Sequence, residues 1–385
     1  MTENIVVIGA GYAGAAAIQS LEAEVDNADI TWISKEDYHL VLHEVHRCIR
    51  DPSVRDKISL PVADIKSPRT RFIKAEVESV DTDDREITLD DDSTVEYDYL
   101  VVALGSKTAY YGIPGLEENS LTLKGLDDAL EIHNQVKEAA REASRNDPAK
   151  IVIGGAGLSG IQTAGEIAEF RDMHRAPIEI YLVEAMEEIF PGQDPEVQGA
   201  LRKRLLDADI NILTNDPITE AAEDTIYFDE GEPLEFDVFV WTGGITGQDA
   251  LEVANVEKNH NRVNADATFQ TSDERVFALG DSAIVEQLNS ERPAPPTAQA
   301  AWQAGGVVGE NVARAMRGQA LNSWSYKDKG TVVSVGDDAV AHNVMMVPIG
   351  TFGGPAARVL KKSIATRWIA DITSVGRAMS AWGDM

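Results

Sequence analysis

The sequence is poor in cysteine and in basic residues, and it contains no long apolar run. Its single cysteine, Cys48, excludes a disulfide framework and any paired-thiol redox centre within one chain. No segment reaches the roughly 18 to 20 consecutive apolar residues that a membrane-spanning helix needs. The N-terminus also lacks the basic and then apolar pattern of a secretion signal. We therefore expect a protein that stays inside the cell, in the cytoplasm.

Acidic residues greatly outnumber basic ones, with 65 Asp and Glu against 34 Lys and Arg, for a net charge of −31. Because this charge is spread along the chain, its field repels phosphate, and we expect no nucleic-acid partner. We interpret the acidity as a solubility adaptation to a salt-rich, halophilic cytoplasm. A length of 385 residues with 43% apolar content predicts a globular protein of two or three domains.

A glycine-rich turn between a strand and a helix stands at the start of the chain. The apolar residues 5–8 predict a buried strand, and the helix-forming run 15–21 follows Gly9, Gly11 and Gly14. In this pattern the first glycine allows a sharp turn and the second lets the backbone approach a pyrophosphate. The third lets helix and strand pack closely. The free N–H groups of the helix N-terminus then hold the phosphates.

A second unit of the same kind starts at residue 150. The strand 150–153 is followed by Gly155, Gly157 and Gly160 and by a helix through Glu169. The strand-like segments 97–105 and 236–244 are also near-copies of one another, which supports an internally duplicated architecture. Two such units predict two bound dinucleotides, and electron transfer requires their rings to face each other.

These features together resemble the two-dinucleotide-binding flavoprotein oxidoreductases. The segment 295–303, PPTAQAAWQ, is similar to a stretch of the type II NADH dehydrogenases, the single-subunit NADH:quinone oxidoreductases, as is the segment 123–130. The resemblance extends from Asn4 to about Gly318. It implies an α/β fold of two Rossmann-like three-layer domains in the glutathione-reductase-like arrangement, with a small C-terminal membrane-interaction module. The expected boundaries are 1–115 and 248–325 for the FAD domain, 116–247 for the NADH domain and 326–385 for the C-terminal module.

The resemblance also implies the FAD-binding residues. Gly9, Gly11 and Gly14 would hold the pyrophosphate, and Asp281 would bind the ribityl chain and phosphate, although a helix N-cap is an alternative role for this acid. Ser34 stands where the family has a ribose-binding carboxylate, so its hydroxyl or Glu36 would substitute. The FAD-binding residues implied beyond the glycine turn are Ser34, Lys35, Glu36, Val77, Gly105, Gly280, Asp281 and Ala298.

The second dinucleotide would be NADH. Gly155, Gly157 and Gly160 would hold its phosphates, with Gly243 beside them. Glu184 closes the strand 179–183, where a carboxylate accepts hydrogen bonds from the ribose hydroxyls. No Arg or Lys follows it closely, so a 2′-phosphate would face like charge and NADH is expected over NADPH.

For the acceptor side, the resemblance implies a quinone such as menaquinone, bound near Ala298, Gln299 and Gln303. The two glutamines lie at i and i+4, so a solvated helix face is the alternative interpretation. Where the family has a glutamate near the flavin, this chain has Gln162, which cannot titrate, while Glu166 follows one helical turn later. The alternative function is a soluble, FAD-dependent NADH:acceptor reductase that uses a redox protein, a dye or oxygen. A non-enzymatic flavin-bound sensor is a third reading.

Two other candidate sites have simpler explanations. Cys48 invites comparison with flavoprotein peroxidases and coenzyme A disulfide reductases, but the surrounding sequence lacks their motif, so we expect a buried, inert thiol. Sulfide:quinone reductases need at least two cysteines and are excluded. His39, His43 and His46 have the spacing of one helix face and, with Glu44, could ligate a metal. We expect no metal, and instead a cap over the flavin and quinone region.

The C-terminal segment 355–385 departs from the acidic composition, with five basic and two acidic residues. Its apolar residues recur every three or four positions and predict one face of a helix with basic flanks, as in interfacial helices. We expect this helix to hold the protein peripherally on the inner face of the cell membrane; packing on its own domain or in a homodimer is the alternative. Strands are expected at 331–335 and 342–347. The predicted apolar face consists of Leu360, Ile364, Trp368, Ile372, Val375, Met379 and Trp382.

Overall fold

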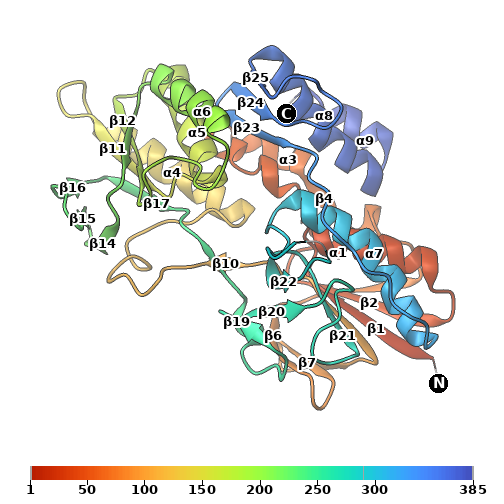
Figure 1. The fold of residues 1–385 in the computed structure, drawn as a ribbon. Helices are drawn as coiled ribbons and strands as arrows, with labels where there is room; N and C mark the ends of the chain where they lie inside the picture. The colour runs from red at the N-terminus through yellow and green to blue at the C-terminus, as the bar shows by residue number, and fades with distance from the viewer. Residues whose placement is uncertain (1, 289, 384–385) are drawn as a thin grey trace.

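The computed structural model describes residues 2–288 and 290–383 (Figure 1). Its first sheet has five parallel strands in the order β21-β9-β1-β2-β5. Most of their residues are apolar and buried, as expected for parallel strands covered on both faces. The strands are β1 (Glu3–Ile8), β2 (Ala28–Ser34), β5 (Thr70–Lys74), β9 (Tyr99–Val102) and β21 (Val276–Ala278).

The strand order changes direction between β1 and β9, which is the topological switch point at which doubly wound sheets bind ligands. Helices α1 (Tyr12–Glu24) and α7 (Ala298–Met316) pack closely against each other beside this point. A Cβ on Gly305 or Gly309 would collide with α1, so these glycines allow the close packing. The segment at the start of the chain and the segment that ends with α7 therefore pack together in one domain.

The second sheet repeats this topology. Its four parallel strands run in the order β13-β12-β11-β17, so the switch point again lies beside the first strand of the unit. This confirms the predicted α/β class with two Rossmann-like domains. Its strands and helices are β11 (Ala149–Gly154), β12 (Ile178–Glu184), β13 (Ile210–Thr214), β17 (Val238–Trp241), α4 (Leu126–Glu142), α5 (Leu158–His174) and α6 (Pro195–Asp207).

Two short antiparallel strands connect the sheets. The chain leaves the first sheet through β10 (Lys107–Thr108) and returns through β18 (Ile245–Thr246), and the two pair with each other (Figure 1). The remaining elements of this part are small. They are β3 (Tyr38–Leu40), β4 (Ser59–Pro61), β6 (Val77–Asp81), β7 (Glu86–Leu89), β8 (Thr94–Glu96), β14 (Ile218–Ala221), β15 (Thr225–Phe228), β16 (Leu234–Glu235), β19 (Lys258–Asn259), β20 (Arg262–Ala265), β22 (Ala283–Val285), α2 (Arg47–Arg50) and α3 (Arg55–Ile58).

The C-terminal module contains a three-stranded antiparallel sheet and two helices. These are β23 (Thr331–Val335), β24 (Asp338–His342), β25 (Thr351–Gly353), α8 (Pro355–Ile372) and α9 (Val375–Ala381). The expected strand at 331–335 is confirmed, whereas the one at 342–347 is wrong. Gly336, with φ of +55°, allows a two-residue turn after β23, so the second strand begins at Asp338 and ends at His342.

The prediction of one C-terminal helix with a continuous apolar face is also wrong. The helix ends at Ile372, and Ser374 caps a second one by accepting a hydrogen bond from the Arg377 amide. Of the predicted face, Trp368 and Ile372 are buried, Leu360 and Trp382 are half-buried, and Ile364, Val375 and Met379 are exposed. The face of α8 that packs inward instead consists of Ala357, Lys361, Ala365, Trp368, Ile369 and Ile372.

Alanines on this inward face let α8 lie close to β23 and β24. The buried side of α8 is therefore the one whose small side chains fit against the sheet, and not the one with the most extensive apolar stripe. Within residues 2–288 and 290–383, no helix is long and apolar enough to cross a membrane.

Candidate functional site

The first glycine turn has the geometry that phosphate binding requires. Gly9 has φ of +103°, and a Cβ there would collide with the Ala103 carbonyl group. A Cβ on Gly14 would collide with the carbonyl oxygen of Gly9, whereas a Cβ on Gly11 would meet only open space. Gly11 is also the N-cap of α1 and provides no side-chain cap, so the N–H groups of the first turn remain available to a ligand.

The second turn repeats this geometry. Gly155 has φ of +91°, a Cβ on Gly160 would collide with the carbonyl oxygen of Gly155, and Gly157 again faces open space at the uncapped start of α5. Gly243 lies directly against Gly155, with its Cα 2.9 Å from a Cβ built there. Both turns therefore fit the pyrophosphate of a dinucleotide.

The other residues implied for FAD gather at the carboxyl edge of the first sheet. Gly105 follows β9 and Gly280 follows β21, both with positive φ. Asp281 comes next; burial raises the pKa of its carboxyl, an effect that Lys124 and Arg262 oppose. Ser106 Oγ lies 3.4 Å from this carboxylate.

Five further residues implied for FAD come from three other segments: the end of β2, the start of β6 and the start of α7. Ser34 is the last residue of β2, and its carbonyl accepts a hydrogen bond from Ala75, two residues before Val77. Lys35 is exposed and Glu36 half-buried. Ala298 begins α7, capped by Thr297. The roles of these residues in binding FAD stay predictions.

Glu184 is fixed at the end of β12. Its carboxylate accepts hydrogen bonds from the amides of Ala156, at 2.8 Å, and Met186, at 3.0 Å. The first of these amides belongs to the second glycine turn, so the carboxylate lies beside the proposed phosphate cradle.

Gln299 and Gln303 do not lie on a solvated helix face. The Gln299 amide donates to the Gly330 carbonyl at 3.1 Å and accepts from the Lys329 amide at 2.7 Å. Gln303 contacts the carbonyl and amide of Lys327 in the same way. Both side chains therefore hold the segment that leads into β23, and a contact with a quinone stays a prediction.

A buried polar cluster joins the two nucleotide domains and the C-terminal module. Lys361 Nζ donates to Ser334 Oγ at 2.6 Å and lies 3.1 Å from His46 Nε2. Gln162 also donates to Ser334 Oγ, at 3.2 Å. Glu166 lies next to this group, with its carboxylate 3.2 Å from Arg50 Nε.

Burial sets the protonation of this cluster. It raises the pKa of Glu166 to about 7 and lowers that of Lys361 to about 8, with neighbouring charges partly opposing both shifts. It lowers the pKa of His46 well below its usual value, so this imidazole is neutral and accepts from Lys361. Burial raises the pKa of Glu44, but the charges of Lys361 and Arg47 outweigh this effect and keep that pKa low. Two groups that titrate near neutrality thus lie within one network.

Contacts connect this cluster to the first glycine turn. Tyr12, the first residue of α1, hydrogen-bonds His43, whose Nε2 lies 3.6 Å from Glu44. His39 donates to the Ala10 carbonyl at 2.8 Å and accepts from the indole of Trp368 at 2.8 Å. The C-terminal helix therefore touches the turn proposed to hold FAD.

Sequence reasoning included Gln162 and Glu166 but missed Lys361, Ser334 and the involvement of Arg50. It placed Lys361 on the basic flank of the last helix. The available signal was the spacing Ala357, Lys361, Ala365, in which small residues flank the lysine on one face. The three histidines do not share one helix either, because His39 lies in β3 and a tight turn separates it from His46.

Cys48 is fully buried, and burial raises the pKa of its thiol to about 12. This confirms the expectation of a buried thiol. Among residues 2–288 and 290–383, no group of three or more His, Cys, Asp or Glu side chains is arranged to hold a metal ion.

Comparison with known proteins supports the duplicated arrangement. Residues 3–305 match the family described as pyridine nucleotide-disulphide oxidoreductase. The type II NADH:quinone oxidoreductase of Staphylococcus haemolyticus is 28% identical over 398 residues, which cover 98% of this chain and 97% of that protein. That of Staphylococcus aureus is 27% identical over 397 residues, covering 98% and 97%. The structure of NDH2 from Plasmodium falciparum in complex with NADH has a TM-score of 0.83 at 16% identity, covering 100% and 98%.

Proposed function

Because the chain belongs to the pyridine nucleotide-disulphide oxidoreductase family, we propose that it is an NADH:quinone oxidoreductase of the type II class. The observation that carries the proposal is the pair of equivalent glycine turns, each at the switch point of its own parallel sheet. The relatives that match almost the whole chain bear the corresponding name. We divide the chain into FAD-binding parts 1–115 and 248–325, an NADH-binding part 116–247 and a C-terminal module 326–385.

FAD, when bound, supplies the two-electron redox chemistry that couples NADH oxidation to quinone reduction. The chain orients and insulates the reactants. The first turns of α1 and α5 would bind the two pyrophosphates through their backbone N–H groups. Asp281 would accept hydrogen bonds from hydroxyl groups of the FAD chain, which would compensate the cost of its burial.

Proton supply to the quinone is assigned to the buried cluster. Quinone reduction to the quinol consumes two protons, and the cluster holds two groups with pKa values near 7 and 8, on Glu166 and Lys361. Gln162 cannot titrate, so it orients Ser334 while Glu166 carries the exchangeable proton.

The structure suggests a direct test of nicotinamide recognition. Replacing Glu184 by Ala removes a charged acceptor for the ribose hydroxyls, and such hydrogen bonds contribute roughly 1.5–3 kcal/mol. We expect the KM for NADH to rise about 10- to 100-fold while the FAD content stays unchanged, as measured by steady-state kinetics and flavin absorbance. Preference of the unmodified protein for NADPH would contradict this assignment.

We also propose a peripheral position on the inner face of the cell membrane, as part of a respiratory chain in a halophilic cytoplasm. Exposed apolar side chains on the last two helices support this: Val359, Ile364, Val375 and Met379. At molar salt the Debye length is about 3 Å, so apolar burial rather than charge would provide the binding energy. Removing the whole segment is a poor test, because Trp368 packs against Tyr12 beside the FAD turn.

Replacing Val375 and Met379 by Ser should instead remove the apolar contact without disturbing the core. We expect binding to lipid vesicles in co-sedimentation to fall at least 10-fold, since each large side chain contributes roughly 1.5–3 kcal/mol. Met173 and Val253, which are 62% and 67% exposed in other parts of the chain, provide the matched control. If the variant still sediments with vesicles but loses a dimer in solution, the face is a homodimer contact.

The acceptor itself is tested by steady-state NADH oxidation at high salt, with and without a soluble quinone analogue. We expect turnover to depend on the quinone. Equal rates with oxygen or a dye alone would favour the soluble NADH:acceptor reductase, and absence of turnover with a reducible flavin would indicate a sensor.

A further inference from the structure

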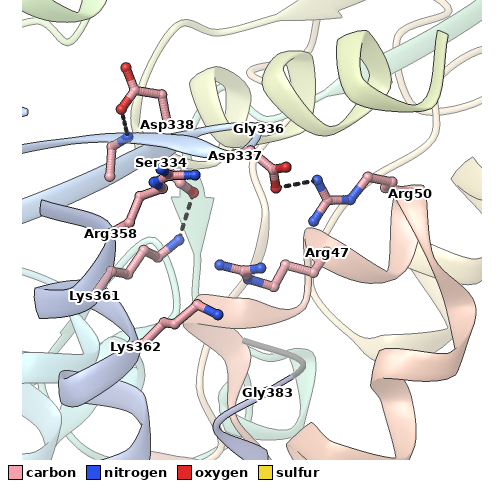
Figure 2. Close-up of a pocket in the computed structure, with 11 residues that line it drawn as sticks. Arg47, Arg50, Ser334, Gly336, Asp337, Asp338, Arg358, Lys361, Lys362 and Gly383 are labelled. Atoms are coloured by element: carbon pink, nitrogen blue, oxygen red, sulfur yellow. Dashed lines mark hydrogen bonds and ion pairs between the residues drawn. The ribbon is translucent and has the colours of Figure 1, made fainter. Parts of the chain in front are cut away.

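A cavity of about 260 Å³ lies between α2, the turn joining β23 to β24, and α8 (Figure 2). Five of its lining side chains are cationic: Arg47, Arg50, Arg358, Lys361 and Lys362. Figure 2 shows Arg47 pointing toward the cavity from one side and Lys361 and Lys362 pointing toward it from the other. No aromatic or large aliphatic side chain of the described residues lines it, so it does not suit a quinone ring and its tail.

Carboxylates pair with three of the five cations around this cavity, Arg47, Arg50 and Lys361. Three carboxylates pair with Arg50: Asp337 at 2.7 Å, Glu166 at 3.2 Å and Glu169 at 4.0 Å. Asp338 pairs with Arg204, outside the cavity, at 2.9 Å. Glu44, behind the cavity wall, is shared by Arg47 and Lys361, at 2.5 and 3.6 Å.

Two of the five cations have no such partner. Arg358 and Lys362 make no ion pair within 4 Å with any residue in 2–288 or 290–383, although the charge of Arg358 helps to lower the pKa of Asp337. In a chain with a net charge of −31, like charges gathered in one cavity oppose each other unless an anion joins them. Both unpaired side chains come from α8, whereas the paired ones are Arg47 and Arg50 of α2 and Lys361 of α8.

We propose that this cavity binds a phosphate-type oxyanion, either free phosphate or pyrophosphate or the phosphate of a phospholipid headgroup. Arginine guanidinium groups bind such oxyanions through paired N–H donors, and lysine adds a point charge. The volume lies just below the roughly 300 Å³ at which pockets for whole small molecules begin, so it suits a phosphate group rather than a dinucleotide.

The site also joins parts of the chain that are distant in sequence. An oxyanion bound here contacts Arg47 beside the FAD domain and Arg358 and Lys362 on the C-terminal module. It therefore stabilises the packing of α8 on the rest of the molecule, because a ligand that binds only the folded state shifts the unfolding equilibrium.

The test uses the holoenzyme with FAD bound and NAD⁺ saturating, so that neither glycine turn can take the probe. Sodium pyrophosphate is titrated against sodium chloride of equal ionic strength, at the lowest salt at which the protein stays folded. Binding of pyrophosphate is measured by the shift in thermal unfolding and by calorimetry. We expect a saturable rise in Tm, and about 10-fold weaker binding in Arg358→Gln and in Lys362→Gln, as for loss of one charged hydrogen-bond partner. Arg367→Gln, on the same helix and outside the cavity, should bind as the unmodified protein does.

A second arm separates the two sources of phosphate. The same variants are sedimented with vesicles of phosphatidylcholine alone or with phosphatidylglycerol. The site is assigned to a lipid headgroup if vesicle binding needs phosphatidylglycerol and pyrophosphate does not bind. That vesicle binding must also be weakened by Arg358→Gln and Lys362→Gln but not by Arg367→Gln. Binding of pyrophosphate assigns it to a free anion. Absence of both, or an equal effect of Arg367→Gln, overturns the proposal.

Discussion

Gly14→Ala should yield a protein that binds FAD one to two orders of magnitude more weakly and is purified largely colourless. The added Cβ would collide with the carbonyl oxygen of Gly9, so α1 must move away from the turn that we propose holds the pyrophosphate. Overpacking of this kind costs about 1–3 kcal/mol. The measurement is FAD affinity by fluorescence titration of the refolded apoprotein.

Two controls make this result specific. Gly199→Ala adds a methyl group inside α6, where nothing lies within 4 Å, and should leave FAD affinity unchanged. Gly160→Ala makes the equivalent collision in the second turn and should weaken NADH binding while the protein stays yellow. A Gly14→Ala protein that retains full FAD affinity would show that the first turn does not hold the cofactor.

Lys361→Met should abolish quinone turnover while NADH still reduces the flavin. Loss of a positioned proton donor lowers a rate by about 10²- to 10⁴-fold. The measurement is stopped-flow flavin reduction by NADH compared with steady-state quinone reduction. Lys203→Met, at an exposed lysine of α6, is the matched charge control and should be unchanged. Equal loss of both half-reactions in Lys361→Met would instead indicate structural damage.

The pH dependence provides an independent check on the same residue. Burial lowers the pKa of Lys361 to about 8, so the group is protonated below this pH and neutral above it. Quinone-dependent turnover should therefore fall as the pH rises through about 8, while the NADH half-reaction should not follow this titration. A profile that is flat between pH 7 and 9 would contradict the role of Lys361.

Much of the fold could be predicted because its signals are local. Gly9, Gly14, Gly155 and Gly160 each occupy a position where a side chain would collide or where φ is positive, and such constraints appear directly in the sequence. The order of strands and glycines thus predicted two nucleotide domains and their cradles.

The buried cluster was beyond local reasoning. Glu44, Gln162, Ser334 and Lys361 lie far apart in the chain. They meet only because α8 packs on β23 and β24 and because α5 packs on β23 and α2. Periodicity placed Lys361 on the basic flank of a surface helix, because a lysine contributes nothing to an apolar pattern. Its burial depends on the partners that compensate its charge, and these come from other elements.

The sequence by itself determined the two dinucleotide-binding units, since a turn between strand and helix is specified by residues within a dozen positions. The tertiary structure alone decided which side of α8 faces inward, where the terminal helix breaks, and which charged groups share a buried network. The reason is physical: backbone sterics act between neighbours in the chain, whereas desolvation and charge pairing depend on whatever the fold places nearby.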